Sequence, residues 1–174
     1  MPHAHEHPPF PAPEHDHGLC LDDAMDRAQK AFEVKGLKLT PLRRAVFQEI
    51  ASSHRAIGAY EVLEAIARKG ERLAPISVYR AIDALVEAGL VHRFESRNAF
   101  FACHTGHEGR QMVLACDVCG RVAEVASSAV FSGIDAAADT ASFTPRRAVV
   151  EVWGVCATCT AEGKTAGQPA HGRS

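Results

Sequence analysis

Four cysteines form two short motifs that could together hold one metal ion. The first is Cys116-Asp-Val-Cys119, followed by Gly120, and the second is Cys156-Ala-Thr-Cys159, with 36 residues between them. Each motif follows a short apolar run, so each lies at the end of an expected strand. Four thiolates in a tetrahedron select zinc or an iron–sulfur centre over magnesium, calcium or manganese. Two redox dithiols or disulfides are the alternative, and the paired spacing favours a closed structural zinc site that folds the second half of the chain.

The composition narrows the class of protein. The chain has 174 residues, six cysteines and a net charge of −2, which allows one large domain or two small ones. It has no charged-then-apolar leader and no apolar run of membrane-spanning length, so we expect a cytoplasmic protein without a membrane partner. In that reducing compartment, cysteines indicate metal or thiol chemistry rather than disulfides. Between Lys38 and Arg93, nine basic residues stand against six acidic ones, a local excess of three positive charges.

Both ends of the chain are predicted to be disordered. Residues 1–20 are rich in Pro and His, which gives too little apolar surface to offset the entropy of ordering. Residues 163–174 are rich in Gly, Ala and polar side chains. His15, His17 and Cys20 could form an accessory metal site, but a solvated tail without a specific role is the favoured interpretation.

Four helices are predicted before residue 90. The first starts at Asp22, with Gly36 after its end, and the second opens at Thr40-Pro41, a capping residue followed by proline. The third spans about 59–69, and the fourth runs from about Pro75 to Gly89. Helical spacing predicts these buried side chains: Met25, Ala28, Phe32, Leu42, Val46, Ile50, Val62, Ile66, Val78, Ile82, Leu85 and Val86.

A β-hairpin follows, with strands at 91–95 and 99–103. Helices followed by a hairpin are typical of a winged helix-turn-helix, here residues 21–103, whose last helix enters the DNA major groove. The polar residues left facing outward on that helix are Ser77, Tyr79, Arg80 and Asp83. Arg80 lies near the helix start and could reach a base edge or a phosphate, although each of these residues could also be merely solvated.

The second half, residues 104–162, is predicted to be a small α/β domain. Strands are expected at 111–115, 121–125 and 148–155, with a helix at about 128–138. A unit of this size is too thin to bury a sufficient core alone, so the four-cysteine site would staple it. The predicted fold class is α+β.

These motifs together resemble the ferric uptake regulator superfamily, and within it the zinc uptake regulator branch, over about residues 22–162. Thr40-Pro41-Leu42-Arg43 resembles the family's Thr-Pro-x-Arg helix start, and the segment 77–82 (Ser-Val-Tyr-Arg-Ala-Ile) resembles its recognition helix. The helix exit at 89–92 and both cysteine motifs are also similar. The resemblance implies a homodimeric, metal-dependent repressor that binds palindromic operators, with a C-terminal dimerisation domain. It also implies base contacts from Tyr60 and Arg80.

The resemblance further implies a second, regulatory zinc site, which would give two zinc ions per chain. His92, Cys103 and Glu124 stand at the spacings of the zinc uptake branch. His107 is the expected fourth ligand; the relatives place this histidine closer to the first cysteine motif, so His104 is a competitor. One thiolate with one carboxylate and imidazoles suits zinc better than iron or manganese.

The sequence also bears on two other classes of function. Zinc deaminases need a His-x-Glu motif and a proline before Cys-x-x-Cys, whereas Ala115 precedes Cys116 and four thiolates leave no open position for water, so no enzyme is predicted. An iron-, manganese- or peroxide-responsive regulator of the same superfamily is the other possibility. The metal that restores operator binding would distinguish an iron or manganese regulator, and zinc release on peroxide treatment would identify an oxidant sensor.

Overall fold

The computed structural model describes residues 17–53, 55–103 and 110–165. They divide into two compact units, one within Ala12–His104 and one within Thr105–Ser174, called here the N-terminal and C-terminal units. No helix in the described ranges is long and apolar enough to cross a bilayer. The predicted arm and tail fall mostly outside the described residues, as do His104 and His107.

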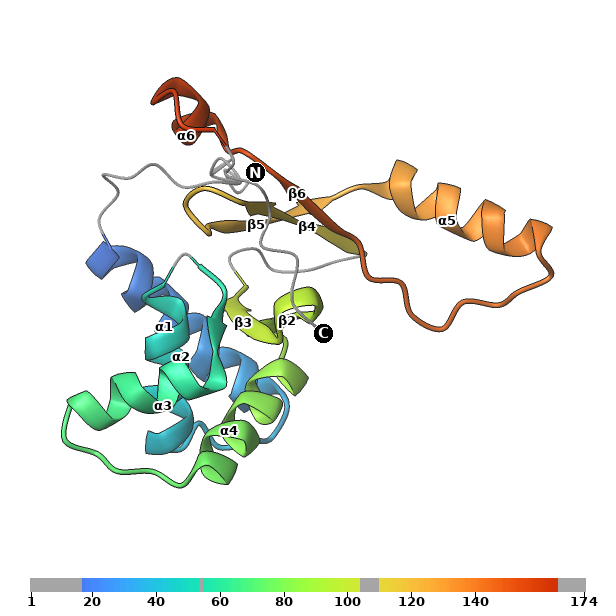
Figure 1. The fold of residues 1–174 in the computed structure, drawn as a ribbon. Helices are drawn as coiled ribbons and strands as arrows, with labels where there is room; N and C mark the ends of the chain where they lie inside the picture. The colour runs from blue at the N-terminus through green and yellow to red at the C-terminus, as the bar shows by residue number, and fades with distance from the viewer. Residues whose placement is uncertain (1–16, 54, 104–109, 166–174) are drawn as a thin grey trace, which may run out of the picture. The chain divides into compact units, whose positions relative to one another are not determined.

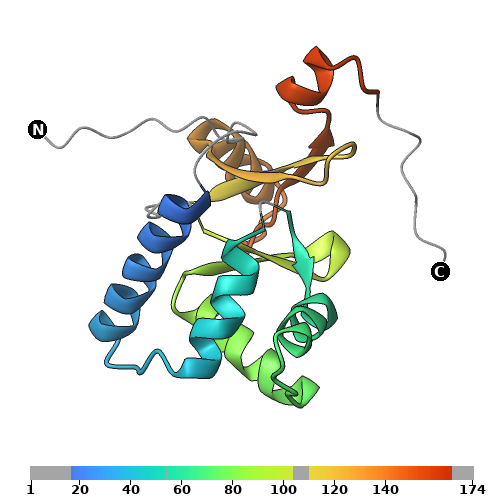
Figure 2. The same cartoon turned by 90° about the vertical axis from the view of Figure 1, so that its left-hand side faces the viewer.

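The N-terminal unit is built on four helices. These are α1 (His17–Val34), α2 (Pro41–Ala51), α3 (Ala59–Arg68) and α4 (Pro75–Glu87). Helix α1 packs against α2, which also contacts α3 and α4 (Figure 2). All four predicted helices are confirmed, although α1 begins five residues before the expected start at Asp22.

Local chemistry sets the helix boundaries. The Thr40 side chain accepts a hydrogen bond from the Arg43 N–H at 3.3 Å, with Pro41 at the first helical position, so the predicted cap of α2 is confirmed. After α4, Gly89 has a φ of +77°, in the left-handed region that favours glycine. The Leu90 N–H can then donate to the Leu85 carbonyl at 3.0 Å, which ends the helix and redirects the chain.

The core of this unit is apolar and draws on every helix. Its most deeply buried side chains are Phe32, Val46, Phe47, Ile50, Val62, Ile66, Val78, Ile82 and Leu85. Most of the predicted core is therefore confirmed, but Val86 is 40% exposed and its predicted burial is wrong. Val86 lies about 100° around α4 from Leu85, at the edge of the face that packs into the core, and so remains partly exposed.

A hairpin completes the N-terminal unit (Figure 1). Strands β2 (Val91–Phe94) and β3 (Ala99–Ala102) pair antiparallel, joined by a 3₁₀ turn at Glu95–Arg97, and the short β1 (Ile57–Gly58) pairs with the other edge of β3. The predicted hairpin is confirmed. Strand β1 was not predicted, because two residues carry no detectable periodicity.

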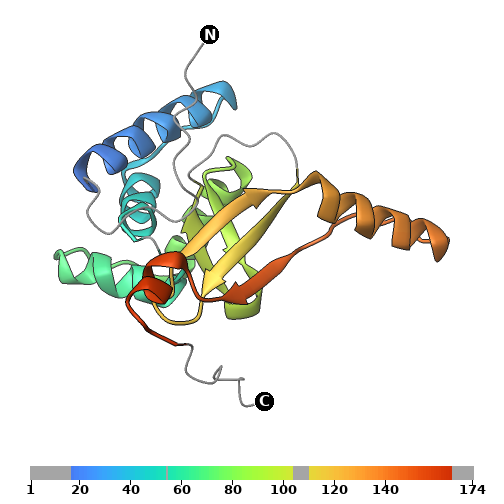
Figure 3. The same cartoon turned by 90° about the horizontal axis from the view of Figure 1, so that it is seen from above.

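The C-terminal unit contains β4 (Gln111–Cys116), β5 (Val122–Ala126), α5 (Ser128–Thr140), β6 (Glu151–Gly154) and α6 (Ala157–Ala161). The sheet order is β5-β4-β6, with β5 antiparallel and β6 parallel to β4. Helix α5 extends from one end of the sheet and α6 lies at the other (Figures 1 and 3). The α+β class is confirmed; β6 is shorter than predicted, and α6 was not predicted.

Leu85 and Val86 provide a matched pair for testing the core. Leu85→Ala should lower the free energy of unfolding by about 2–5 kcal/mol, because Leu85 is fully buried. Val86→Ala should change it by about 0.5 kcal/mol or less, as at other surface positions. Urea unfolding followed by circular dichroism at the helical band measures both. Equal destabilisation by the two substitutions would contradict this packing of α4.

Candidate functional site

The four cysteines of the paired motifs meet at one end of the C-terminal sheet. Cys116 ends β4, Cys119 lies in the turn that follows, Cys156 caps α6 and Cys159 lies within it. Their four sulfur atoms all lie within 4.8 Å of one another. The Cys119 and Cys156 sulfurs are 3.8 Å apart. A tetrahedron with Zn–S bonds of about 2.3 Å has edges of about 3.8 Å, so this separation suits zinc.

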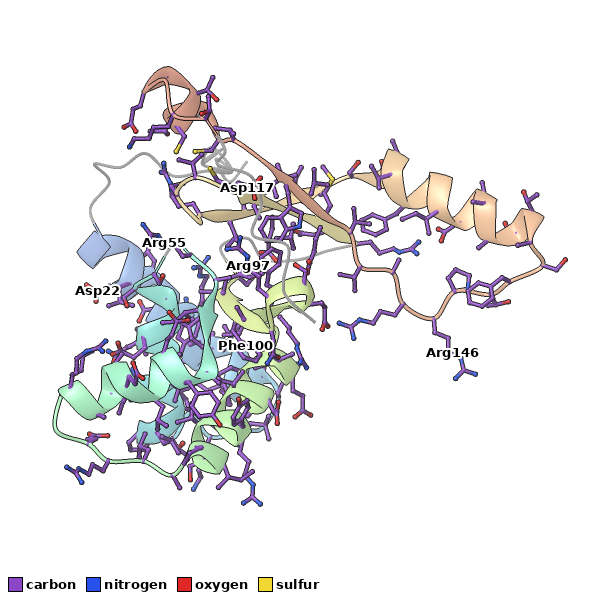
Figure 4. All side chains as sticks on the ribbon, in the orientation of Figure 1. Asp22, Arg55, Arg97, Phe100, Asp117 and Arg146 are labelled. Carbon is purple, nitrogen blue, oxygen red and sulfur yellow. The ribbon has the colours of Figure 1, made fainter. Side chains whose placement is uncertain are left out.

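Strand pairing brings the two motifs together across 36 intervening residues. Cys116 on β4 lies in register with Gly154 on the parallel strand β6, and the Asp117 N–H donates to the Gly154 carbonyl at 2.8 Å. Asp117 is labelled in Figure 4 at the turn between β4 and β5, and yellow sulfur atoms gather close to it. The pairing of β6 with β4 therefore places Cys156, the first cysteine of the second motif, beside the turn of the first motif.

The thiols of this cluster differ widely in acidity. Burial acts to raise the pKa of Cys116, but backbone N–H groups, including that of Cys156 at 3.3 Å, outweigh it and lower the pKa to about 6. Burial and the neighbouring sulfurs raise the pKa of Cys159 to about 12. The cluster therefore favours the thiolates of the first motif but resists ionisation of Cys159, a conflict that a divalent cation at its centre would relieve. None of the five described cysteines forms a disulfide, which disfavours the disulfide alternative.

Arg121 is a residue of this site that the sequence analysis missed. Its Nε donates to Cys119 Sγ at 3.3 Å, and although burial acts to raise the pKa of Cys119, this hydrogen bond contributes to lowering it. A cation directly after Cys-x-x-Cys-Gly is the signal that could have identified it. No ligand role follows, because a guanidinium donates hydrogen bonds and does not bind metal.

Two of the four predicted regulatory ligands lie together in the N-terminal unit. His92 is on β2 and Cys103 directly follows β3, and their ligand atoms lie within 4.8 Å of each other. The Cys103 N–H donates to the Leu90 carbonyl at 2.9 Å, which continues the hairpin ladder. The His92 ring stacks on Phe101, with centroids 5.8 Å apart. The hairpin thus places one imidazole beside one thiol.

Of the other predicted regulatory ligands, one belongs to the C-terminal unit and the other falls outside the described residues. Glu124 is on β5 of the C-terminal unit, opposite Val113 of β4, and is half-buried. His107 and its competitor His104 lie outside the described residues, as do the side chains of His15, His17 and Cys20. The regulatory set as a whole therefore stays a prediction.

The predicted DNA-contacting residues lie on α3 and α4. Tyr60, in the first turn of α3, is 64% exposed, and Arg80 on α4 is exposed. Tyr79 is half-buried and packs edge-to-face on Tyr60, with centroids 6.3 Å apart. Ser77 is also half-buried. Arg80 and Tyr60 thus present most of their surface outward, while Tyr79 in part fixes the position of Tyr60.

Two further residues near the predicted DNA-binding helices have roles that the sequence did not predict. Ile76 is 58% exposed and lies four residues before Arg80, on the same helix face, yet an apolar residue there gave no signal of function in the sequence.

Arg43 donates to the Lys38 carbonyl at 2.7 Å, and its guanidinium lies over the Phe32 ring. The arginine of the Thr-Pro-x-Arg motif therefore ties α1 to α2.

Comparisons with known proteins agree with this geometry. The model of the ferric uptake regulator family matches residues 34–152. The zinc uptake regulation protein of Escherichia coli K12 is 32% identical over 139 residues, which cover 79% of this chain and 81% of that protein. The ferric uptake regulation protein of Legionella pneumophila is 31% identical over 127 residues, or 71% of this chain and 92% of that protein.

Solved structures are similar as well. A zinc uptake regulator complexed with zinc and DNA superposes with a TM-score of 0.76 and 30% identity, over 82% of this chain and 97% of that one. The holo form of XcZur gives a TM-score of 0.71 and 36% identity, over 81% of this chain and 99% of that one.

Removal of the metal should unfold the C-terminal unit, because zinc binding of this kind contributes on the order of 10 kcal/mol. Trp153, the chain's single tryptophan, lies on β6 and reports on this sheet. Chelation, or Cys156→Ser, should shift its fluorescence to longer wavelength and remove the cooperative thermal transition of the sheet. Cys103→Ser is the control and should leave the Trp153 emission unchanged. Unaltered emission after complete zinc removal would show that the sheet holds without the ion.

Proposed function

Because the chain belongs to the ferric uptake regulator family, we infer that it is a zinc-responsive DNA-binding repressor of the zinc uptake regulator branch. The observation that carries this function is the similarity to the zinc uptake regulator complexed with zinc and DNA, at 30% identity over 82% of the chain. The four-cysteine cluster, which suits zinc, agrees with it. The chain acts as a regulator and not as an enzyme.

The repressor is a homodimer that binds double-stranded operator DNA. A two-fold dimer presents two copies of α4, so its operator is palindromic, with half-sites about one helical turn or a multiple apart. In each copy, α4 enters the major groove, where Arg80 reaches base edges and Ser77 and Tyr79 support it, while Tyr60 contacts DNA from α3. The protein works where its operator DNA lies, in the bacterial cytoplasm.

A second zinc site makes the repressor responsive, so each chain binds two zinc ions. Its ligands are His92, Cys103 and Glu124, with His107, or alternatively His104, as the fourth. The closeness of the His92 and Cys103 ligand atoms on one hairpin supports this set, since half of it is arranged before zinc arrives. One thiolate and one carboxylate balance the charge of a divalent ion, and imidazole nitrogens complete a tetrahedron.

The switch follows from where these ligands originate. His92 and Cys103 belong to the N-terminal unit and Glu124 to the C-terminal unit, so a shared ion restricts the orientation of one unit against the other. In the dimer, that orientation sets the distance between the two copies of α4. A shift from mostly inactive to mostly active requires zinc to prefer the DNA-competent state by roughly 5 kcal/mol.

An iron-, manganese- or peroxide-responsive regulator is the second candidate, and the resemblance to the ferric uptake regulation protein of Legionella pneumophila favours the iron form. Cys103 argues against iron and manganese sensing, because those ions prefer imidazole and carboxylate oxygen to a thiolate. Zinc therefore remains the effector that the ligand types support best.

Cys103→Ser tests the regulatory site. The variant should fold and retain the structural zinc, but its operator affinity should no longer rise with zinc, because one of four ligands is lost. The measurement is fluorescence anisotropy with operator DNA, titrated against buffered free zinc, iron and manganese at one fixed salt concentration. Wild type should respond to zinc over the other two metals. A variant that still bound DNA in a zinc-dependent way would rule out this ligand set.

Arg80→Ala tests the reading of bases. Loss of a contact to a base edge should cost about 1–3 kcal/mol at the operator and relax discrimination at one position of each half-site. Binding to operators with single base changes would measure this loss. The zinc content should stay at the wild-type value. A uniform loss across all sequences would instead make Arg80 a phosphate contact.

A further inference from the structure

The side chain of Arg121 lies against the four-cysteine cluster without belonging to its ligands. Its Nε donates to Cys119 Sγ at 3.3 Å, and its Nη2 donates to Cys156 Sγ at 3.8 Å. Cys119 belongs to the first motif and Cys156 to the second, so one guanidinium contacts a sulfur of each. Arg121 is half-buried, which limits the water that competes for these hydrogen bonds.

The backbone fixes this placement. The Gly120 N–H donates to the Cys116 carbonyl, and the Cys116 N–H donates to the Arg121 carbonyl, both at 2.9 Å. Gly120 has a φ of +71°, in the left-handed region, and so reverses the chain directly before Arg121. The turn that positions the sulfurs of Cys116 and Cys119 therefore also fixes the backbone position of Arg121.

The net negative charge of a zinc-loaded cluster explains how this contact could stabilise the site. Four thiolates around a divalent ion carry a net charge of −2, which is costly to hold in a buried site without compensation. Hydrogen bonds from a guanidinium to anionic sulfur are charge-assisted, and the planar fork can serve two acceptors at once. Lys164, five residues after Cys159, is another cation near this site, but its ammonium pairs with the Glu162 carboxylate at 2.7 Å.

We propose that Arg121 is a positioning residue for the structural zinc. It holds one thiolate of each motif in the arrangement of the ligands and offsets part of the cluster's negative charge, so that the ion is retained more tightly. This role rests on zinc occupying the four-cysteine cluster, as in the proposed function, and adds a residue from outside the ligand set.

Zinc affinity provides the first test. Arg121→Leu leaves a shorter, apolar side chain and removes the charge and the donors. In full-length protein carrying Cys103→Ser, which disables the proposed regulatory site, its zinc Kd should rise about 10–100-fold in competition with a chromogenic chelator. Arg121→Lys should recover part of this loss because it keeps the charge. Lys164→Leu removes a neighbouring charge that is not bonded to sulfur and should retain the parent Kd.

Cobalt(II) in place of zinc supplies a readout that folding alone would not move. Hydrogen bonds stabilise the sulfur lone pairs, so Arg121→Leu should shift the sulfur-to-cobalt charge-transfer bands to lower energy. An unchanged Kd with unshifted bands, or an equal loss in Lys164→Leu, would overturn the role of Arg121. A parent protein without thiolate charge-transfer bands would instead remove the metal assignment on which that role rests.

Discussion

Four sulfur atoms within 4.8 Å of one another impose the constraint on which the C-terminal unit depends. Without a cation they cannot all ionise, as the separation between the Cys116 pKa of about 6 and the Cys159 pKa of about 12 shows. Apart from the cysteines, few side chains are buried among the described residues of this unit: Ala115, Val122, Ala123 and Phe131. A core of that size contributes little to the stability of the unit, so metal binding supplies much of its folding free energy. Folding of this half is therefore linked to metal.

The N-terminal unit is stabilised differently. Its core is apolar and draws on α1, α2, α3, α4 and the hairpin, so its fold needs no ion. His92 and Cys103 lie on that hairpin, where the ladder and the contact between His92 and Phe101 hold them whether or not a metal is present. Metal at the proposed regulatory site can therefore bind and leave without unfolding this unit. The separation between the four-cysteine site and this proposed site is what a reversible sensor requires.

Signals confined to a few residues allowed most of this structure to be predicted. Thr40-Pro41 and Gly89 marked helix ends, and each Cys-x-x-Cys is a local motif that can be recognised without knowledge of the tertiary fold. Prediction failed where the outcome depends on distant contacts. Leu85 and Val86 are equally apolar, and only the packing of α4 decides which is buried. The local sequence places a cation directly after Cys-x-x-Cys-Gly, but only the pairing of β6 with β4 brings Cys156 within reach of Arg121.

The different donor atoms of the two proposed zinc sites also predict which site binds zinc more tightly. Four thiolates form a soft, closed site, and Arg121 reduces the charge that would otherwise oppose it. A site with one thiolate, one carboxylate and imidazoles binds zinc less tightly and exchanges it more readily. The structural site therefore fills first and stays filled over the range of free zinc in which the proposed regulatory site responds. A repressor built this way loses its signal before it loses its fold, so zinc shortage lifts repression without destroying the protein.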